Sequence, residues 1–82
     1  MSTLWKRINV RAYAGMKGME KPREIFFDDH STVVKVLSEW LEEGLHFRER
    51  RRYFRVVSIE TKREYLIYHD LKSNQWFVKP AS

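Results

Sequence analysis

Five arginines lie within HFRERRRYFRV, residues 46–56, and the aromatic residues Phe47 and Tyr53 bracket four of them. A guanidinium group binds phosphate oxygens through paired hydrogen bonds, and a neighbouring aromatic ring can stack on an unpaired base. Residue types in this combination are typical of proteins that bind single-stranded nucleic acid. The candidate nucleic-acid-binding residues are therefore Phe47, Arg48, Arg50, Arg51, Arg52, Tyr53 and Arg55.

The positive charge of the chain is concentrated in this stretch. The 82 residues carry 16 Lys and Arg against 11 Asp and Glu, a formal net charge of +5. Five arginines and one glutamate in residues 46–55 give a local charge of 5 − 1 = +4. A concentrated field attracts a polyanion, whereas a solvated turn or strand end is the simpler interpretation of the same residues. The sequence alone leaves both interpretations open.

Patterns that indicate catalysis or metal binding are missing from the sequence. It contains no GxxxxGK[ST], GxSxG or HExxH motif. The absence of cysteine excludes disulfides and thiolate metal sites. His30, His46 and His69 lack the close spacing of paired metal ligands. We therefore expect a non-enzymatic protein without a metal or cofactor.

Several short segments around the arginines have the composition and periodicity of β-strands. Residues 4–13 alternate, and the other expected strands cover 23–29, 53–59, 63–70 and 75–79. Short polar connections between the last three predict an antiparallel meander. Under the simplest registers, one face holds Phe54, Val56, Leu66, Tyr68, Trp76 and Val78. The other face then holds Tyr53, Arg55, Val57, Tyr65 and Phe77, with Tyr53 packed against Tyr65.

Residues 31–44 are compatible with two structures. Val33, Val36, Leu37, Trp40 and Leu41 have helical spacing. The β-branched valines instead favour a strand, in which Val34, Val36 and Trp40 share one face.

The preferred fold is all-β, an antiparallel meander that curls into an SH3/OB-like barrel of five to six strands. The alternative is an α+β fold with one helix at about 32–43 packed on the sheet. We expect a single domain over residues 1–82, because the chain is too short for a second core. No apolar run is long enough for a signal peptide or a membrane span, so we expect a cytoplasmic protein.

Residues scattered between positions 10 and 78 match a sequence pattern. They follow a VxxYxGxKxxExP pattern and then VxxVL, W, RxYFRV and further aromatic positions. The matching residues are Val10, Tyr13, Gly15, Lys17, Glu20, Pro22, Val33, Val36, Leu37, Trp40, Arg51, Tyr53, Phe54, Arg55, Val56, Tyr65, Ile67, Tyr68, Asp70, Trp76 and Val78.

In these positions the chain resembles a family of small, uncharacterised bacterial β-rich domains. Its second half is also similar to the C-terminal domain of the inactive Y-family-polymerase-like protein of bacterial mutagenesis cassettes. The resemblance covers most of residues 10–78 and implies a strand at 32–42 and a bacterial protein, but no activity. The chain departs from the family in lacking glycine at residues 60–62 and in its basic run before Tyr53.

These observations predict a module that binds single-stranded nucleic acid without sequence preference, through a basic loop and an aromatic sheet face. One alternative is a protein–protein interaction module that docks an acidic segment of a partner. Another is a homo-oligomer held together by an uncovered aromatic face.

Overall fold

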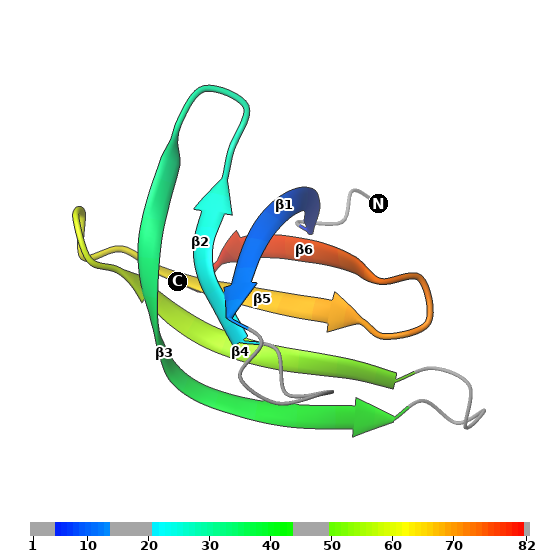
Figure 1. Ribbon diagram of the computed structural model, residues 1–82. Helices are drawn as coiled ribbons and strands as arrows, with labels where there is room; N and C mark the ends of the chain where they lie inside the picture. The colour runs from blue at the N-terminus through cyan, green and yellow to red at the C-terminus, as the bar shows by residue number, and fades with distance from the viewer. Residues whose placement is uncertain (1–4, 14–20, 44–49, 82) are drawn as a thin grey trace.

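The computed structural model describes residues 5–13, 21–43 and 50–81, and the regular elements in these ranges are all β-strands (Figure 1). The strands are β1 (Lys6–Tyr13), β2 (Lys21–Phe26), β3 (Ser31–Glu43), β4 (Arg50–Ser58), β5 (Glu64–Asp70) and β6 (Gln75–Pro80). Each pairs antiparallel with its neighbours, and pairing of β1 with β6 closes a barrel. The predicted all-β barrel is confirmed. The alternative helix at 32–43 is wrong, because β3 occupies this segment.

Two strands change neighbours along their length. In β1, residues 6–8 pair with β6 and residues 9–13 pair with β2. In β3, residues 31–33 pair with β2, whereas residues 34–43 pair with β4. Figure 1 shows β3 bending from the β2 side of the barrel to the long sheet of β3 to β6.

The core lies inside this barrel and follows the alternation of side chains along the strands. Its buried hydrophobic residues are Ile8, Ile25, Val34, Phe54, Val56, Ile67, Trp76 and Val78. Val10 and Ala12 pack against them, as the alternation of residues 4–13 predicts. The inward positions predicted for β4 and β6 are also confirmed. In the part of the chain that is described, no helix is long and apolar enough to span a membrane.

The predicted inner face of β5 is wrong by one residue. Ile67 and His69 are buried, whereas Leu66 and Tyr68 lie on the other face. Both sets contain large apolar side chains, so periodicity alone cannot show which set faces the core. The turn between β4 and β5 sets the register and therefore determines which set is buried. In this turn the Ser58 amide donates to the Arg63 carbonyl at 2.8 Å, which fixes Phe54 opposite Ile67.

The position of Tyr53 changes for the same reason. Its cross-strand neighbour on β5 is Tyr68, not the predicted Tyr65, which packs against the core. Within the turn, Lys62 adopts a φ of 64°, in the left-handed region that favours glycine.

The predicted common face of Val34, Val36 and Trp40 is also wrong. Val36 lies opposite Val56 and Ser38 opposite Arg55, so Leu37 is an extra residue on β3. Such a bulge reverses the alternation that follows it. Val34 and Val36 therefore contact the core, whereas Trp40 lies on the outside opposite Tyr53.

Candidate nucleic-acid interface

Strand alternation separates the arginines of the basic stretch onto two faces of β4. Tyr53 and Arg55 lie on the outer face, as does Arg51, and Arg52 lies on the inner side with Phe54. Arg50 is exposed at the first position of the strand. Phe47 and Arg48 lie outside the described residues. The arginines that are adjacent in the sequence therefore do not form one surface.

The Arg52 side chain is held by contacts with other residues of the protein. Its Nη2 donates to Glu39 Oε2 at 3.0 Å, and its guanidinium carbon lies 5.6 Å from the ring centroid of Phe54. Lys21 Nζ contacts the other oxygen of Glu39 at 3.2 Å. Only 16% of the Arg52 side chain is exposed. Arg52 thus helps to join β4 to β3 at the inner side of the sheet, and Lys21 links β2 to the same carboxylate.

Four aromatic residues form a row across the outer face of β3, β4, β5 and β6. Trp40 lies opposite Tyr53, Tyr53 opposite Tyr68, and Tyr68 opposite Phe77. The centroids of successive rings are 5.5, 5.4 and 4.7 Å apart. These four residues are the aromatic row. Because neighbouring strands lie about 4.8 Å apart, the row is roughly 14 Å long.

The aromatic row is partly open to solvent. Trp40, at its β3 end, is 40% exposed, and the other three rings have intermediate exposure. Trp5, just before β1, packs edge-on against Tyr68 at 4.7 Å and against Tyr53 at 6.1 Å. At the β6 end, Arg7 lies opposite Phe77. The row thus has an exposed indole at one end and a cation at the other.

A second row of residues runs parallel to the aromatic row on the side of the β4–β5 turn. The strand registers place Ser38, Arg55, Leu66 and Lys79 side by side across β3 to β6. We call these residues the cationic row. Lys79 Nζ lies 4.9 Å from the Trp5 ring centroid. Arg55 Nη2 lies 2.7 Å from Glu64 Oε1, with both side chains substantially exposed.

The opposite side of the aromatic row has a different charge balance. There the registers align Glu42, Arg51, Asp70 and Gln75. The Arg51 guanidinium carbon lies 5.1 Å from the Tyr68 ring centroid, and carboxylates occupy the neighbouring strands on both sides of Arg51. We call these four residues the mixed row. Its one cation and two carboxylates make it less attractive to a polyanion than the cationic row.

Tyr68, at the centre of the outer face, is a neutral phenol at physiological pH. Burial raises its pKa above the ordinary value of 10.0, although the positive charge of Arg51 opposes the change. Its ring therefore adds no negative charge to the surface at neutral pH.

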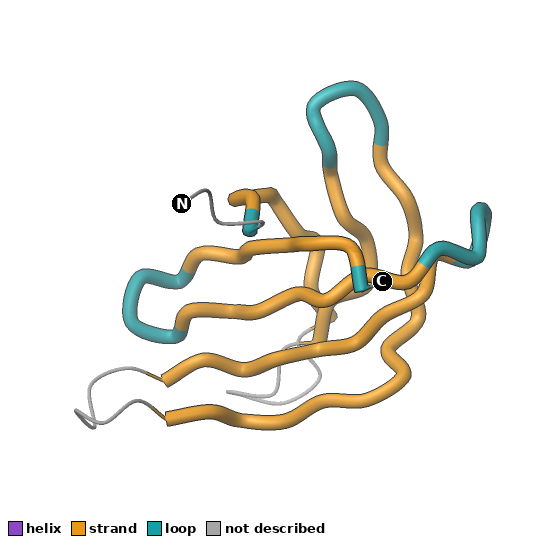
Figure 2. Tube along the Cα trace, turned by 180° about the vertical axis from the view of Figure 1, so that it is seen from behind, coloured by secondary structure: helices purple, strands orange, loops and turns teal. Residues whose placement is uncertain are grey.

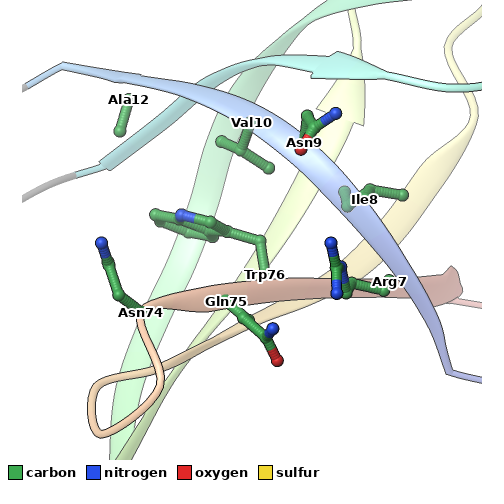
Figure 3. Close-up of a pocket in the computed structure, with 8 residues that line it drawn as sticks. All are labelled: Arg7, Ile8, Asn9, Val10, Ala12, Asn74, Gln75 and Trp76. Carbon is green, nitrogen blue, oxygen red and sulfur yellow. The ribbon is translucent and has the colours of Figure 1, made fainter.

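A groove begins beyond Arg7, where β1 diverges from β6. It has a volume of about 390 Å³ and is lined by Arg7, Ile8, Asn9, Val10, Ala12, Asn74, Gln75 and Trp76 (Figure 3). The inner side is closed by Trp76, which stacks on His69 at 4.0 Å, and His69 Nε2 lies 2.8 Å from Asn74 Oδ1. Gln75 extends away from Trp76 on the other side of β6. The polar side chains that line the groove therefore point in different directions and do not form an enclosed pocket.

The two described histidines, His30 and His69, have local partners. His30 Nδ1 lies 2.6 Å from Asp29 Oδ1 in the exposed β2–β3 turn, and this hydrogen bond lowers the pKa of the Asp29 carboxyl. His69 packs in the barrel wall as described above, and His46 lies outside the described residues. Across residues 5–13, 21–43 and 50–81, no three histidine or acidic side chains are grouped in a way that could hold a metal ion.

Sequence reasoning found part of this surface and missed the rest. Tyr53, Arg55 and Phe77 were expected on one face, and the structure places them there. The contributions of Trp40 and Tyr68 depend on the β3 bulge and on the β4–β5 turn, which periodicity did not reveal. Arg7 and Lys79 are distant from the arginine cluster in sequence; barrel closure brings Arg7 to this face, and pairing of β6 with β5 places Lys79 on it. Comparisons with protein-family models, curated proteins and solved structures give no match.

Proposed function

We propose that the outer face of β3 to β6 binds single-stranded nucleic acid without sequence preference. The observation that carries this proposal is the aromatic row, which lies on the solvent side of the sheet and beside a row of cations. Every base has an aromatic face, so stacking on protein rings tolerates any sequence. Stacking typically contributes about 1–3 kcal/mol per base.

The charge distribution favours one path for the phosphates. The cationic row carries Arg55, which pairs with Glu64 beside the row, and Lys79, and Arg7 extends the positive charge at the Phe77 end. The mixed row contains Glu42 and Asp70, which repel phosphate. We therefore expect the backbone to follow the cationic row, with bases directed toward the aromatic row. This moves the expected phosphate contacts away from most of the arginine cluster.

Trp40 is the best candidate for the first stacked base. One face of its indole stacks on Tyr53 with an interplanar angle of 8°, and the residue is among the most exposed large apolar side chains described. A base added beyond the indole would extend an existing stack. Such an addition requires little rearrangement of the sheet.

The test is a fluorescence anisotropy titration of a labelled single-stranded oligonucleotide of mixed sequence at about 50 and 200 mM salt. If Arg7, Arg55 and Lys79 each neutralise one phosphate, the slope of log K against log salt is about −0.7 × 3, or −2.1. Affinity then falls roughly 20-fold between the two salt concentrations. The absence of binding at the lower salt concentration would refute the proposal.

Three single variants test the predicted phosphate path. Arg55→Gln and Lys79→Gln should each make the salt slope shallower by about 0.7. Arg51→Gln in the mixed row should change the slope much less. Arg23→Gln, at an exposed position on β2, is the matched control for loss of one arginine. Equal effects of all four substitutions would indicate a general dependence on net charge instead of a defined path.

An acidic protein segment is the other ligand class that these cations would attract. The aromatic row favours nucleic acid, because peptide carboxylates gain nothing from a stacking surface. Competition with polyglutamate separates the two classes: it should displace the oligonucleotide poorly at equal charge concentration. Equal competition would favour the acidic protein partner.

A further inference from the structure

A pocket of about 470 Å³ lies where the β4–β5 turn meets the end of β6. It is lined by Arg55, Lys62, Arg63, Glu64, Tyr65, Pro80 and Ala81. Figure 2 shows the end of β6 beside the strands that this turn joins, and the Ala81 amide donates to the Glu64 carbonyl at 3.1 Å. Because Arg55 belongs to both the pocket and the cationic row, the pocket adjoins that row on the side away from the aromatic row.

The pocket is positively charged. Three of its residues are cations and one is a carboxylate, so the lining carries a net charge of 3 − 1 = +2. Glu64 Oε1 lies 2.8 Å from Arg55 Nε and 2.7 Å from Arg55 Nη2. A guanidinium group has several N–H donors, so the Nη1 group of Arg55 is left for a second anion. Among the described residues, the side chains of Lys62 and Arg63 form no ion pair.

Hydrogen bonds hold the β4–β5 turn in a defined conformation. Besides the bond from the Ser58 amide to the Arg63 carbonyl, the Lys62 amide donates to the Ser58 carbonyl at 2.9 Å. Ser58 Oγ accepts from the Thr61 amide at 3.2 Å, and Thr61 Oγ1 accepts from the Arg63 amide at 3.3 Å. The backbone that carries the two cations is therefore ordered before any ligand binds, which lowers the entropic cost of binding.

Lys62 occupies a backbone conformation that glycine adopts more easily. At its φ of 64°, a residue with a Cβ atom has a conformational cost that glycine avoids. Residues held in such conformations are concentrated at ligand-binding sites. A lysine at this position supplies a cation at the pocket, which glycine cannot.

We infer that this pocket binds the terminal phosphate of the strand that follows the cationic row, an inference that rests on the proposed function. An internal phosphate carries a single negative charge, whereas a terminal phosphate monoester carries about −1.5 to −2 at neutral pH. The terminal group therefore matches the charge of the pocket lining, and its free oxygens suit the N–H groups of arginine. Since one ester bond joins it to the strand, it can turn away from the stacked bases toward the β4–β5 turn.

The test compares three oligonucleotides of the same mixed sequence, each with an internal fluorophore. One has a 5′-phosphate, one has a 3′-phosphate, and one has hydroxyl groups at both ends. Anisotropy titrations at about 50 mM salt measure the three affinities. We expect the wild type to bind one of the phosphorylated strands about 5-fold more tightly than the hydroxyl strand.

Two double variants locate the preference. Lys62→Gln/Arg63→Gln should bring the ratio of the two affinities close to one. Lys72→Gln/Arg23→Gln removes the same charges at exposed positions outside the pocket and should preserve the ratio. Lys62→Gly is a further variant whose backbone suits the turn, so its urea midpoint should be no lower than that of the wild type while the preference falls.

The possible outcomes separate this inference from the proposed function. Equal affinity of the wild type for all three strands would overturn the inference and leave the proposed function intact. A preference that persists in Lys62→Gln/Arg63→Gln would also overturn it, because the terminal phosphate would then bind elsewhere. A failure of all three strands to bind would refute the proposed function and this inference together.

Discussion

The inner and outer faces of the β4–β6 sheet both contain aromatic residues, but the rings have different neighbours. On the inner face, Phe54 and Trp76 lie 5.9 Å apart among aliphatic core residues. On the outer face, Tyr53 and Tyr68 belong to a row that lies between the cationic row and the mixed row and is partly open to solvent. The aromatic residues of this sheet therefore belong to two different surfaces. Burial stabilises the first, whereas the second retains exposed surface, to which we propose that nucleic acid binds.

Charged residues show the same division. The inner Arg52 contacts Glu39 and Phe54 and has little exposed surface. The outer Arg55 also contacts a carboxylate, but its side chain remains about half exposed. An arginine contributes to the fold on one face and remains accessible to an anion on the other. Substitutions on the two faces should therefore affect different measurements.

The largest effect is expected for Trp76→Ala. Trp76 is only 8% exposed and packs against His69 and Phe54, so its removal leaves a cavity in the core. We expect the free energy of unfolding to fall by about 3–5 kcal/mol, measured by urea denaturation. A small loss would show that the inner face is not the principal source of stability.

Trp40→Ala should affect binding more than folding. Loss of its stacking on Tyr53 should lower the free energy of unfolding by about 0.5–1.5 kcal/mol. Loss of one stacked base should weaken oligonucleotide binding roughly 5- to 150-fold, equivalent to about 1–3 kcal/mol. Leu71→Ala, at a residue of the same 40% exposure in the β5–β6 turn, is the control. Unchanged affinity in Trp40→Ala would remove Trp40 from the proposed site.

The pair Arg52→Gln and Arg55→Gln contrasts the two faces directly. Arg52→Gln should lower the free energy of unfolding by about 1–2 kcal/mol, because it removes a hydrogen bond to a carboxylate from a side chain that is only 16% exposed. Arg55→Gln should change stability within about 0.5 kcal/mol, because its ion pair is exposed. Urea denaturation of both variants checks this order, and the reverse order would contradict the assignment of faces.

A smaller effect is expected from Tyr68 at alkaline pH. Since burial raises the pKa of Tyr68 in the folded protein, the neutral phenol stabilises the fold below pH 10.0. This contribution should be lost as pH rises above 10.0 through the folded-state pKa. Absorbance titration should show one tyrosine that ionises later than the unfolded reference. Tyr68→Phe should remove that late step and reduce the alkaline loss of stability.

The sequence predicted features that depend on composition and local alternation. The all-β fold, the inner faces of β4 and β6, and the common face of Tyr53 and Phe77 all follow from these signals. The face of β5 did not, because both of its faces are apolar and the register depends on hydrogen bonds in the Ser58–Arg63 turn. The side of Trp40 depends on one unpaired residue, Leu37, which no periodic pattern identifies in advance.

The candidate site was predicted less completely than the fold. Clustering along the chain grouped Arg51 with Arg52, yet successive residues of a strand project to opposite faces. Conversely, Arg7 joins Lys79 on the outer face because the first and last strands pair. A surface made by barrel closure is a property of long-range registers, which local sequence patterns do not contain.

Pairing of β1 with β6 also has a consequence for the time course of folding. The first strand has its complete set of neighbours only after the other five strands have been synthesised and the last of them has reached residues 6–8. Contacts of such long sequence separation are slow to form, so residues 6–8 of a partly made chain, including the apolar Ile8, lack their partner strand for the whole interval. Formation of the β1–β6 pair therefore ends the period during which the nascent chain can aggregate through this strand.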